Sequence, residues 1–186
     1  MRIFLAVFPP AAAQDLAFGV IEGLRRPGDG VSWVKRDNLH YTLRFLGEIG
    51  EDGLRRATEA AREAASGGPA FDAMLGACGA FPSAKRARVL WLGLAAGEEP
   101  LLGLARRLET ALARRGFAPE GRDFSAHLTI GRVREPGPDW GARLAAVKSL
   151  EGGRDAGFRV SALSVMKSTL SPKGSIYEVI AAAPLA

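Results

Sequence analysis

Cysteine is almost absent from this sequence, which has Cys78 alone among 186 residues. A single cysteine excludes an intrachain disulfide and a cysteine-based zinc site. Cys78 stands in an apolar stretch with no neighbouring cation to lower the pKa of its thiol, so we expect a small buried hydrophobe rather than a nucleophile. This cysteine usage is typical of a reducing compartment, and we expect a cytoplasmic protein.

Long hydrophobic runs are also missing. No apolar stretch approaches the ~20 residues that a helix needs to cross a bilayer. Residues 3–8 imitate the hydrophobic part of a secretory signal, but the run is short and ends at Pro9 and Pro10. A first β-strand ended by prolines fits this stretch better. We therefore expect neither a secretory signal nor a membrane partner.

Charge of either sign is present in ordinary amounts. The chain has 25 basic and 20 acidic residues, a net charge of +5 and a sequence pI of about 9.9. This excess suits an anionic partner such as nucleic acid, but it also occurs in proteins that have no such ligand. Hydrophobic residues make up 47% of the chain, which is typical of one compact domain or two small lobes that share a core.

Strand-like and helix-like segments alternate along the chain. Helical periodicity predicts four helices, at residues 12–25, 51–65, 99–115 and 139–148. Strands are expected at residues 2–8, 31–35, 39–46, 71–78, 87–94, 126–133, 158–170 and 175–182. Several strand pairs are joined by connections too short for a helix, so we expect an α+β fold with antiparallel or mixed sheets.

Histidine is scarce as well, and its two occurrences carry the most information. His40 and His127 each precede a threonine by two residues, in HYTL at 40–43 and HLTI at 127–130. The chain has only five threonines, so both coincidences arise by chance in roughly one sequence in a thousand. The alternatives are two unrelated surface histidines or one catalytic pair, which requires the two strands to lie side by side or across a cleft.

Strand alternation predicts which side chains share a face with these histidines. Residues i and i+2 of a strand point the same way, so each histidine shares a face with its threonine. The expected core side of the first motif strand is Leu39, Tyr41, Leu43 and Phe45, and the opposite side holds His40, Thr42 and Arg44.

Two histidines and two threonines suit the opening of a cyclic phosphodiester by water. A base takes the proton of water while an acid on the other side of phosphorus protonates the departing sugar oxygen. Histidine serves either role near neutral pH. The threonine hydroxyls and a nearby cation can hold the phosphate oxygens. No metal or cofactor is required, and two histidines without an acidic cluster make a poor metal site.

The residues around the motifs resemble the 2H phosphoesterase superfamily, defined by two His-x-Thr/Ser-x motifs. More narrowly, they are similar to the bacterial RNA 2',3'-cyclic phosphodiesterases, the LigT-like or 2'-5' RNA ligase family. The resemblance covers nearly the whole chain. It rests on RIFLAV at 2–7, WV at 33–34, LHYTLRFLG at 39–47, FSAHLTIGR at 124–132 and LSPKGSIY at 170–177.

The resemblance implies a single 2H phosphoesterase domain over residues 1–186, made of two pseudo-symmetric lobes. In this bilobal α+β fold, two antiparallel or mixed sheets flank a central cleft and the helices lie outside. It also implies hydrolysis of RNA 2',3'-cyclic phosphate ends to a 2'-phosphate. By analogy His40 is the proton donor and His127 the proton acceptor, although the sequence by itself does not order them. Thr42 and Thr129 bind the phosphate.

Other residues near the motifs are further candidates for the substrate site. Arg132 matches a basic residue that follows the second motif in this family, but simple alternation puts it on the face opposite His127. Gly131 can let the strand bulge and turn Arg132 inward. Arg132 is then a phosphate ligand, and the alternative is a plain surface arginine. Arg44 is either a phosphate ligand or a residue at the cleft edge. Aromatic faces stack nucleobases, and the aromatic residues considered are Trp33 and Tyr177, left open, and Phe45, expected in the core.

Other functions remain as alternatives. Related reactions are 2'-5' RNA ligation and cleavage of other cyclic or 2',5'-linked nucleotides. A different class is a non-catalytic protein that binds RNA ends. A serine hydrolase has little support, because the Gly-x-Ser-x-Gly motif is missing. The expected partner is an RNA or oligonucleotide with a 2',3'-cyclic phosphate end, and the expected oligomeric state is a monomer.

Overall fold

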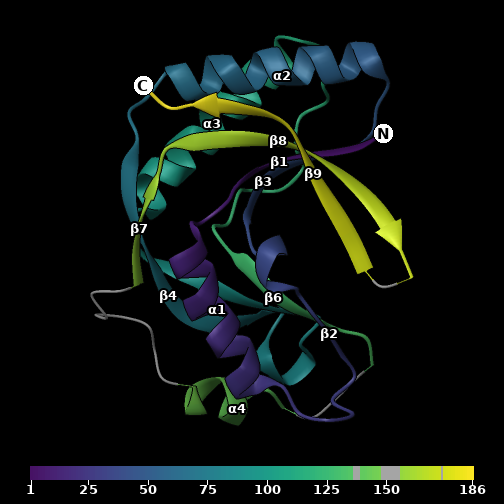
Figure 1. The fold of residues 1–186 in the computed structure, drawn as a ribbon, viewed down its shortest axis with the longest axis vertical. Coiled ribbons are helices and arrows are strands. Elements are labelled where there is room, and N and C mark those ends of the chain that lie inside the picture. The colour runs from purple at the N-terminus through teal and green to yellow at the C-terminus, as the bar shows by residue number, and fades with distance from the viewer. Residues whose placement is uncertain (136–138, 148–155, 173) are drawn as a thin grey trace.

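The computed structural model describes residues 1–135, 139–147, 156–172 and 174–186 (Figure 1). Its helices are α1 (Ala11–Leu24), α2 (Glu51–Ser66), α3 (Glu98–Ala113) and α4 (Gly141–Ala146), with 3-10 turns η1 (Arg36–Asn38) and η2 (Ala84–Arg86). Its strands are β1 (Arg2–Val7), β2 (Val31–Trp33), β3 (Tyr41–Glu48), β4 (Phe71–Phe81), β5 (Val89–Ala96), β6 (Leu128–Val133), β7 (Gly157–Val160), β8 (Ala162–Ser171) and β9 (Gly174–Pro184).

The strands join into one sheet with the order β7-β4-β5-β6-β3-β1-β8-β9, and β2 pairs with the side of β6. Every strand pair in the described part of the chain is antiparallel. The two halves of the sheet meet at β3 and β6, which are paired through Tyr41 and Leu128. The α+β class predicted from the sequence is therefore confirmed, and a single residue pair connects the two sets of strands.

The helices lie on the outside of this curled sheet (Figure 1). Helix α2 runs along β8 and β9 with α3 beside it, while α1 and α4 lie at the other half, near β4 and β6. Among the described residues, none of the helices is both long and apolar enough to span a bilayer.

The apolar stripe of α3 shows why this helix is a firm part of the core. Its predicted face is buried throughout, and Leu104 and Leu108 have no exposed surface. The helix ends before Gly116, whose φ of +79° suits glycine. Truncating one such leucine to alanine typically costs about 2–5 kcal/mol of stability. The buried residues of this face are Leu101, Leu104, Ala105, Leu108, Ala111 and Leu112.

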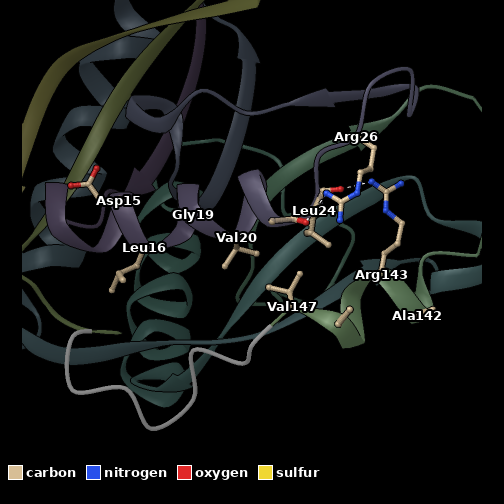
Figure 2. Close-up of a pocket in the computed structure, with 11 residues that line it drawn as sticks. Asp15, Leu16, Gly19, Val20, Leu24, Arg26, Ala142, Arg143 and Val147 are labelled. Atoms are coloured by element: carbon tan, nitrogen blue, oxygen red, sulfur yellow. Dashed lines mark hydrogen bonds between the residues drawn. The ribbon is translucent and has the colours of Figure 1, made fainter.

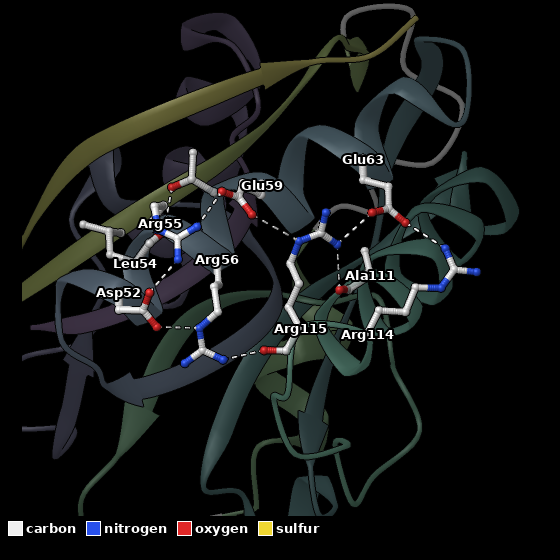
Figure 3. A network of polar contacts seen from close by, with 10 residues as sticks. Asp52, Leu54, Arg55, Arg56, Glu59, Glu63, Ala111, Arg114 and Arg115 are labelled. Atoms are coloured by element: carbon white, nitrogen blue, oxygen red, sulfur yellow. Dashed lines mark hydrogen bonds and ion pairs between the residues drawn. The ribbon is translucent and has the colours of Figure 1, made fainter.

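Charged side chains join α2 to the end of α3 on the surface (Figure 3). Glu63 of α2 accepts from both Arg114, at 3.0 Å, and Arg115, at 2.7 Å. Arg56 pairs with Asp52 and also donates to the backbone oxygen of Arg115. Isolated surface ion pairs contribute little to the free energy of unfolding. The two helices are held together mainly by their apolar faces, and the charged network helps to set their relative placement.

Some predicted boundaries are wrong. The long strand expected at residues 158–170 is two strands, because the extended segment is interrupted at Ser161 and its two parts pair with different strands. Strand β7 pairs with β4 and β8 pairs with β1. A continuous apolar run does not reveal such a break. The last helix is shorter than expected, at Gly141–Ala146, and Lys148 lies outside the described residues.

Candidate active site

The two histidine motifs meet where the halves of the sheet join. Tyr41 of β3 and Leu128 of β6 are antiparallel partners. In an antiparallel pair, the residue before one partner lies opposite the residue after the other. This register therefore puts His40 across from Thr129 and Thr42 across from His127. Two motifs that are distant in sequence therefore form one four-residue group.

Both imidazole rings are held in the same way. Nδ1 of His40 lies 2.6 Å from the backbone oxygen of Asn38, and Nδ1 of His127 lies 2.8 Å from that of Ser125. A carbonyl oxygen only accepts hydrogen bonds, so each Nδ1 carries the hydrogen and donates it. In each ring Nε2 is then the nitrogen that takes up or releases a proton.

A pocket of about 890 Å³ opens beside this group. His127, Thr42, Thr129 and Arg132 line it, and the rest of its wall comes from residues 43–45 of β3, from α3 and from the segment 120–125. His40 is not one of the lining residues. It nevertheless lies within electrostatic reach of the lining residues Arg132 and His127. The volume is in the range of pockets that hold ligands the size of a nucleotide.

Strand β6 contains an extra residue directly after the threonine of its motif. The adjacent residues Leu90 and Trp91 of β5 pair with Gly131 and Thr129, so Ile130 has no partner in this register. An extra residue shifts the alternation of side chains by one position. Arg132 therefore shares the face of His127, and it is exposed at the pocket.

Strand β3 contains the equivalent extra residue. Adjacent residues of β1 pair with Arg44 and Thr42, so Leu43 is skipped. Two predictions based on strict alternation are wrong for this reason: Phe45 is 59% exposed instead of in the core, and Arg44 is buried instead of facing away from it. Phe45 occupies the place in the first motif that Arg132 occupies in the second, and it lines the same pocket.

The buried guanidinium of Arg44 is surrounded by acceptors. Its Nη1 lies 3.1 Å from a carboxylate oxygen of Glu120 and 3.3 Å from one of Glu109, and its Nη2 donates to the backbone oxygen of Ala118. These contacts tie β3 to the segment that leads into the second motif. The sequence left Arg44 as a phosphate ligand or a residue at the cleft edge. Arg44 borders the pocket, but its guanidinium contacts these protein acceptors, which favours the cleft edge.

His40 is enclosed much more than the sequence indicates. The rings of Phe4, Phe8 and Tyr177 lie 5.0 to 5.4 Å from its imidazole centroid. Burial lowers the pKa of His40 to about 4, against the hydrogen bond to Asn38, which favours the charged form. The positive charge of Arg132 lowers it further, as does a proton on His127 when one is present. In the free protein at neutral pH, His40 is therefore neutral.

This burial makes stability depend on pH. The pKa of His40 is about 4 in the folded chain and about 6.5 in the unfolded chain. Between these values only the unfolded chain binds the proton, so stability falls as the pH is lowered through this window. We expect wild type to lose about 2 kcal/mol more than His40→Gln between pH 7 and pH 5, as measured by urea unfolding. Equal losses in the two proteins would contradict the low pKa.

Gly131 offers a test of how β2 and β6 support the bulge. A Cβ at this position would lie 2.8 Å from Val31 and 3.0 Å from the ring of Trp33. We expect Gly131→Ala to cost about 1–3 kcal/mol in thermal or urea unfolding, because β2 must move. Gly121→Ala is the control, since its Cβ would meet no atom within 4 Å. Similar stability of the two variants would show that β2 yields easily.

The aromatic candidates fall in different places. Trp33 packs against Trp140, with ring centroids 6.0 Å apart, and does not line the pocket. Tyr177 meets the imidazole of His40 edge-on. Sequence reasoning missed Phe4 and Phe8, which lie too far from His40 in the chain to be linked to it by spacing. It also missed the roles of Asn38 and Ser125, because the acceptor in each is a backbone oxygen, which any residue type would supply.

A second pocket, of about 660 Å³, lies between α1 and α4 (Figure 2). Aliphatic side chains such as Leu16, Val20 and Val147 line it, with Arg26 and Arg143 at one end. Neither motif histidine borders it. Among the described residues, no three histidine, cysteine or acidic side chains gather as a possible metal site.

Comparison with known proteins agrees with this geometry. Residues 7–91 and 92–177 each match the LigT-like phosphoesterase family. An RNA 2',3'-cyclic phosphodiesterase of Methanothermobacter thermautotrophicus is 35% identical over 177 residues, covering 95% of both chains. One from Thermotoga maritima is 31% identical over 180 residues, covering 97% of this chain and 93% of the relative.

A solved structure is similar over the same length. The crystal structure of TT0787 from Thermus thermophilus superimposes with a TM-score of 0.84 at 28% identity, covering 100% of this chain and 98% of that one. Both halves of the sequence, and with them both histidine motifs, fall inside the family match. The chain belongs to the LigT-like phosphoesterase family.

Proposed function

We propose that this protein hydrolyses RNA 2',3'-cyclic phosphate ends to 2'-phosphates. The observation that carries the proposal is the crosswise pairing of the two motifs, with both rings presenting Nε2 as the titrating nitrogen. The activity named for relatives that match almost the whole chain supports the same reaction. The expected partner is an RNA or oligonucleotide that carries the cyclic phosphate.

In the proposed reaction His127 accepts the proton of the attacking water, and His40 donates a proton to the departing 3' oxygen. The bond from phosphorus to the water oxygen forms as the bond to the 3' oxygen breaks, which leaves the phosphate on the 2' oxygen. An acid and a base on opposite sides of phosphorus suit this in-line displacement. Thr42, Thr129 and Arg132 hold the phosphate oxygens and offset the charge of the transition state.

His40 requires one further step, because its pKa of about 4 leaves it neutral in the free protein. A phosphate anion beside the ring favours the charged imidazolium and raises that pKa. We propose that His40 gains its proton together with the substrate. The neutral ring adds no positive charge to a pocket that already contains Arg132.

We also propose that residues 1–186 form one domain of two pseudo-symmetric lobes, which acts as a monomer in the cytoplasm. The sheet order supports the lobes, since β1, β8 and β9 extend from β3 as β5, β4 and β7 extend from β6. The motif residues all come from a single chain, which supports a monomer. The expected RNA substrate supports the cytoplasm.

The function is tested by incubating the protein with a short RNA that ends in a 2',3'-cyclic phosphate, in the presence of EDTA. We expect turnover that EDTA does not reduce, because the scheme uses only side chains, and a product with the phosphate on the 2' oxygen. The position of the phosphate is assigned by NMR or by treatment with a phosphatase. Loss of activity on chelation, or a 3'-phosphate product, would overturn the proposal.

A further inference from the structure

The environments of the two motif histidines differ, although their backbone hydrogen bonds match. Phe8 stacks on His40 at 5.0 Å and 25°, Phe4 lies tilted at 5.1 Å, and Tyr177 meets it edge-on at 5.4 Å and 82°. Around His127 the one ring contact within the described chain is with Phe81, at 5.2 Å. The enclosure is therefore specific to the first motif.

Three separate elements build this enclosure. Phe4 belongs to β1 and is almost fully buried, and Phe8 follows that strand. Tyr177 comes from β9, on the long β8–β9 hairpin that extends past the rest of the sheet (Figure 1). Strand β9 is the last strand of the sheet, held by its pairing with β8 and by packing against α2, and β8 is paired with β1 from Ser164 to Ser168. Ser175, opposite Leu170, lies beyond this stretch, toward the tip of the hairpin.

Asn38 connects the hairpin to the support of His40. Its side-chain Nδ2 donates to the backbone oxygen of Ser175, at 2.9 Å, two residues before Tyr177. Its own backbone oxygen accepts from Nδ1 of His40, at 2.6 Å. One residue thus touches both the imidazole and the strand that places a ring against it.

We propose that Asn38 and Tyr177 are positioning residues, which register the β8–β9 hairpin against His40 and hold its imidazole in one orientation. The proposal rests on the proposed function for its effect on catalysis, but not for its effect on the ring. Phe4 of β1 and Phe8 directly after it cover two sides of the imidazole, and Tyr177 covers a third from β9. Pairing with β8 places Tyr177 in the sheet, and the bond from Asn38 adds the link between this strand and the residue that holds the ring.

The charges that face His40 are those of Arg132 and His127, both of which disfavour its protonation. Neither belongs to the hairpin. Loosening the hairpin leaves these two charges in place and admits water to the ring, which favours the charged form. A shift in the titration of His40 therefore reports on the enclosure itself.

The experiment uses NMR of the full chain with labelled histidine, which yields only two imidazole signals because the chain has two histidines. Asn38→Ala and Tyr177→Leu are expected to raise the pKa of His40 by about one unit, while the His127 signal keeps its titration. In wild type the His40 signal should be that of the Nδ1–H form. His40→Gln assigns the two signals.

Turnover of the cyclic phosphate is the second readout. Both variants are expected to lower kcat about 10- to 100-fold, as misplaced catalytic groups do, with a smaller change in KM. Tyr177→Phe restores the ring and should recover both the His40 titration and most of the lost turnover. Ile176→Ala is the matched control, because Ile176 is a neighbouring hairpin residue that is 57% exposed.

The outcomes separate the possible explanations. If His40 titrates as in wild type in both Asn38→Ala and Tyr177→Leu, the proposal is wrong, whatever happens to activity. A raised KM with an unchanged His40 signal would make Tyr177 a contact for the nucleobase instead. If wild type turns over no cyclic phosphate, the proposed function fails, while the NMR result still decides the positioning role. Thermal unfolding of each variant identifies a general loss of fold.

Discussion

Replacing His127 or His40 with alanine is expected to lower turnover of an RNA 2',3'-cyclic phosphate by about 10³-fold. Each substitution removes a proton transfer that a positioned acid or base accelerates by about 10²- to 10⁴-fold. The measurement is kcat under saturating substrate with EDTA present. The fold should persist in His127→Ala, because its side chain is only partly buried. The enclosed His40 needs a bulkier replacement as a control for folding.

The double variant sharpens this prediction. Residues that act as one catalytic unit give non-additive losses, so His40→Ala with His127→Ala should be little worse than either single change. His40→Gln controls for the space that alanine leaves among Phe4, Phe8 and Tyr177. Losses that multiply in the double variant would indicate two independent contributions instead of one acid–base pair. Circular dichroism and thermal unfolding establish that all variants are folded.

Replacing Arg132 with methionine is expected to lower kcat/KM by about 10²-fold. Methionine keeps much of the length of the side chain and removes the charge that would face the phosphate at the pocket. Loss of one donor to a developing oxyanion typically costs about 10²- to 10³-fold. The bulge at Ile130 gives this prediction its geometric basis, since it brings Arg132 to the pocket beside His127.

Arg88→Met is the matched control for this change. Arg88 lies next to β5 and is exposed like Arg132, but it does not line the pocket. We expect its replacement to leave kcat/KM within about twofold, since isolated surface charges have small effects. If both arginine variants lose activity equally, Arg132 acts through the general positive charge of the surface and not as a phosphate ligand.

The removal of Arg132 also affects His40 in a defined direction. The charge of Arg132 is one of the causes that lower the pKa of His40. In Arg132→Met the His40 signal of the free protein should therefore titrate at higher pH than in wild type. A change in activity without this shift would place Arg132 farther from His40 than the structure does.

The sequence by itself determined the class of the fold and the family, and it predicted the chemistry of the site. Two His-x-Thr motifs in a chain without other histidines predicted an acid–base pair, and the flanking residues predicted the family. The apolar stripe of α3 was readable from the sequence, because leucine and alanine recurring with a 3.6-residue period fall on one face of a helix, and that face must be the buried one. These features depend on residues close together in the chain, so the sequence shows them directly.

The tertiary structure decided which side chains reach the pocket. An extra residue in each motif strand reverses the alternation after the threonine, which buries Arg44, exposes Phe45 and turns Arg132 inward. In β6 the glycine at 131 allowed for such a bulge, but no residue type near Leu43 announces the one in β3, because the shift arises from how each strand pairs with its neighbour.

The enclosure of His40 was equally invisible from the sequence. Phe4, Phe8 and Tyr177 surround it only because β1 and β9 come together in the same half of the sheet. The protonation state of a histidine depends on the solvent and charge around its ring, and those are set by long-range packing. The pattern of residues therefore predicted the reacting groups, and the fold sets the pKa and the surroundings of one of them.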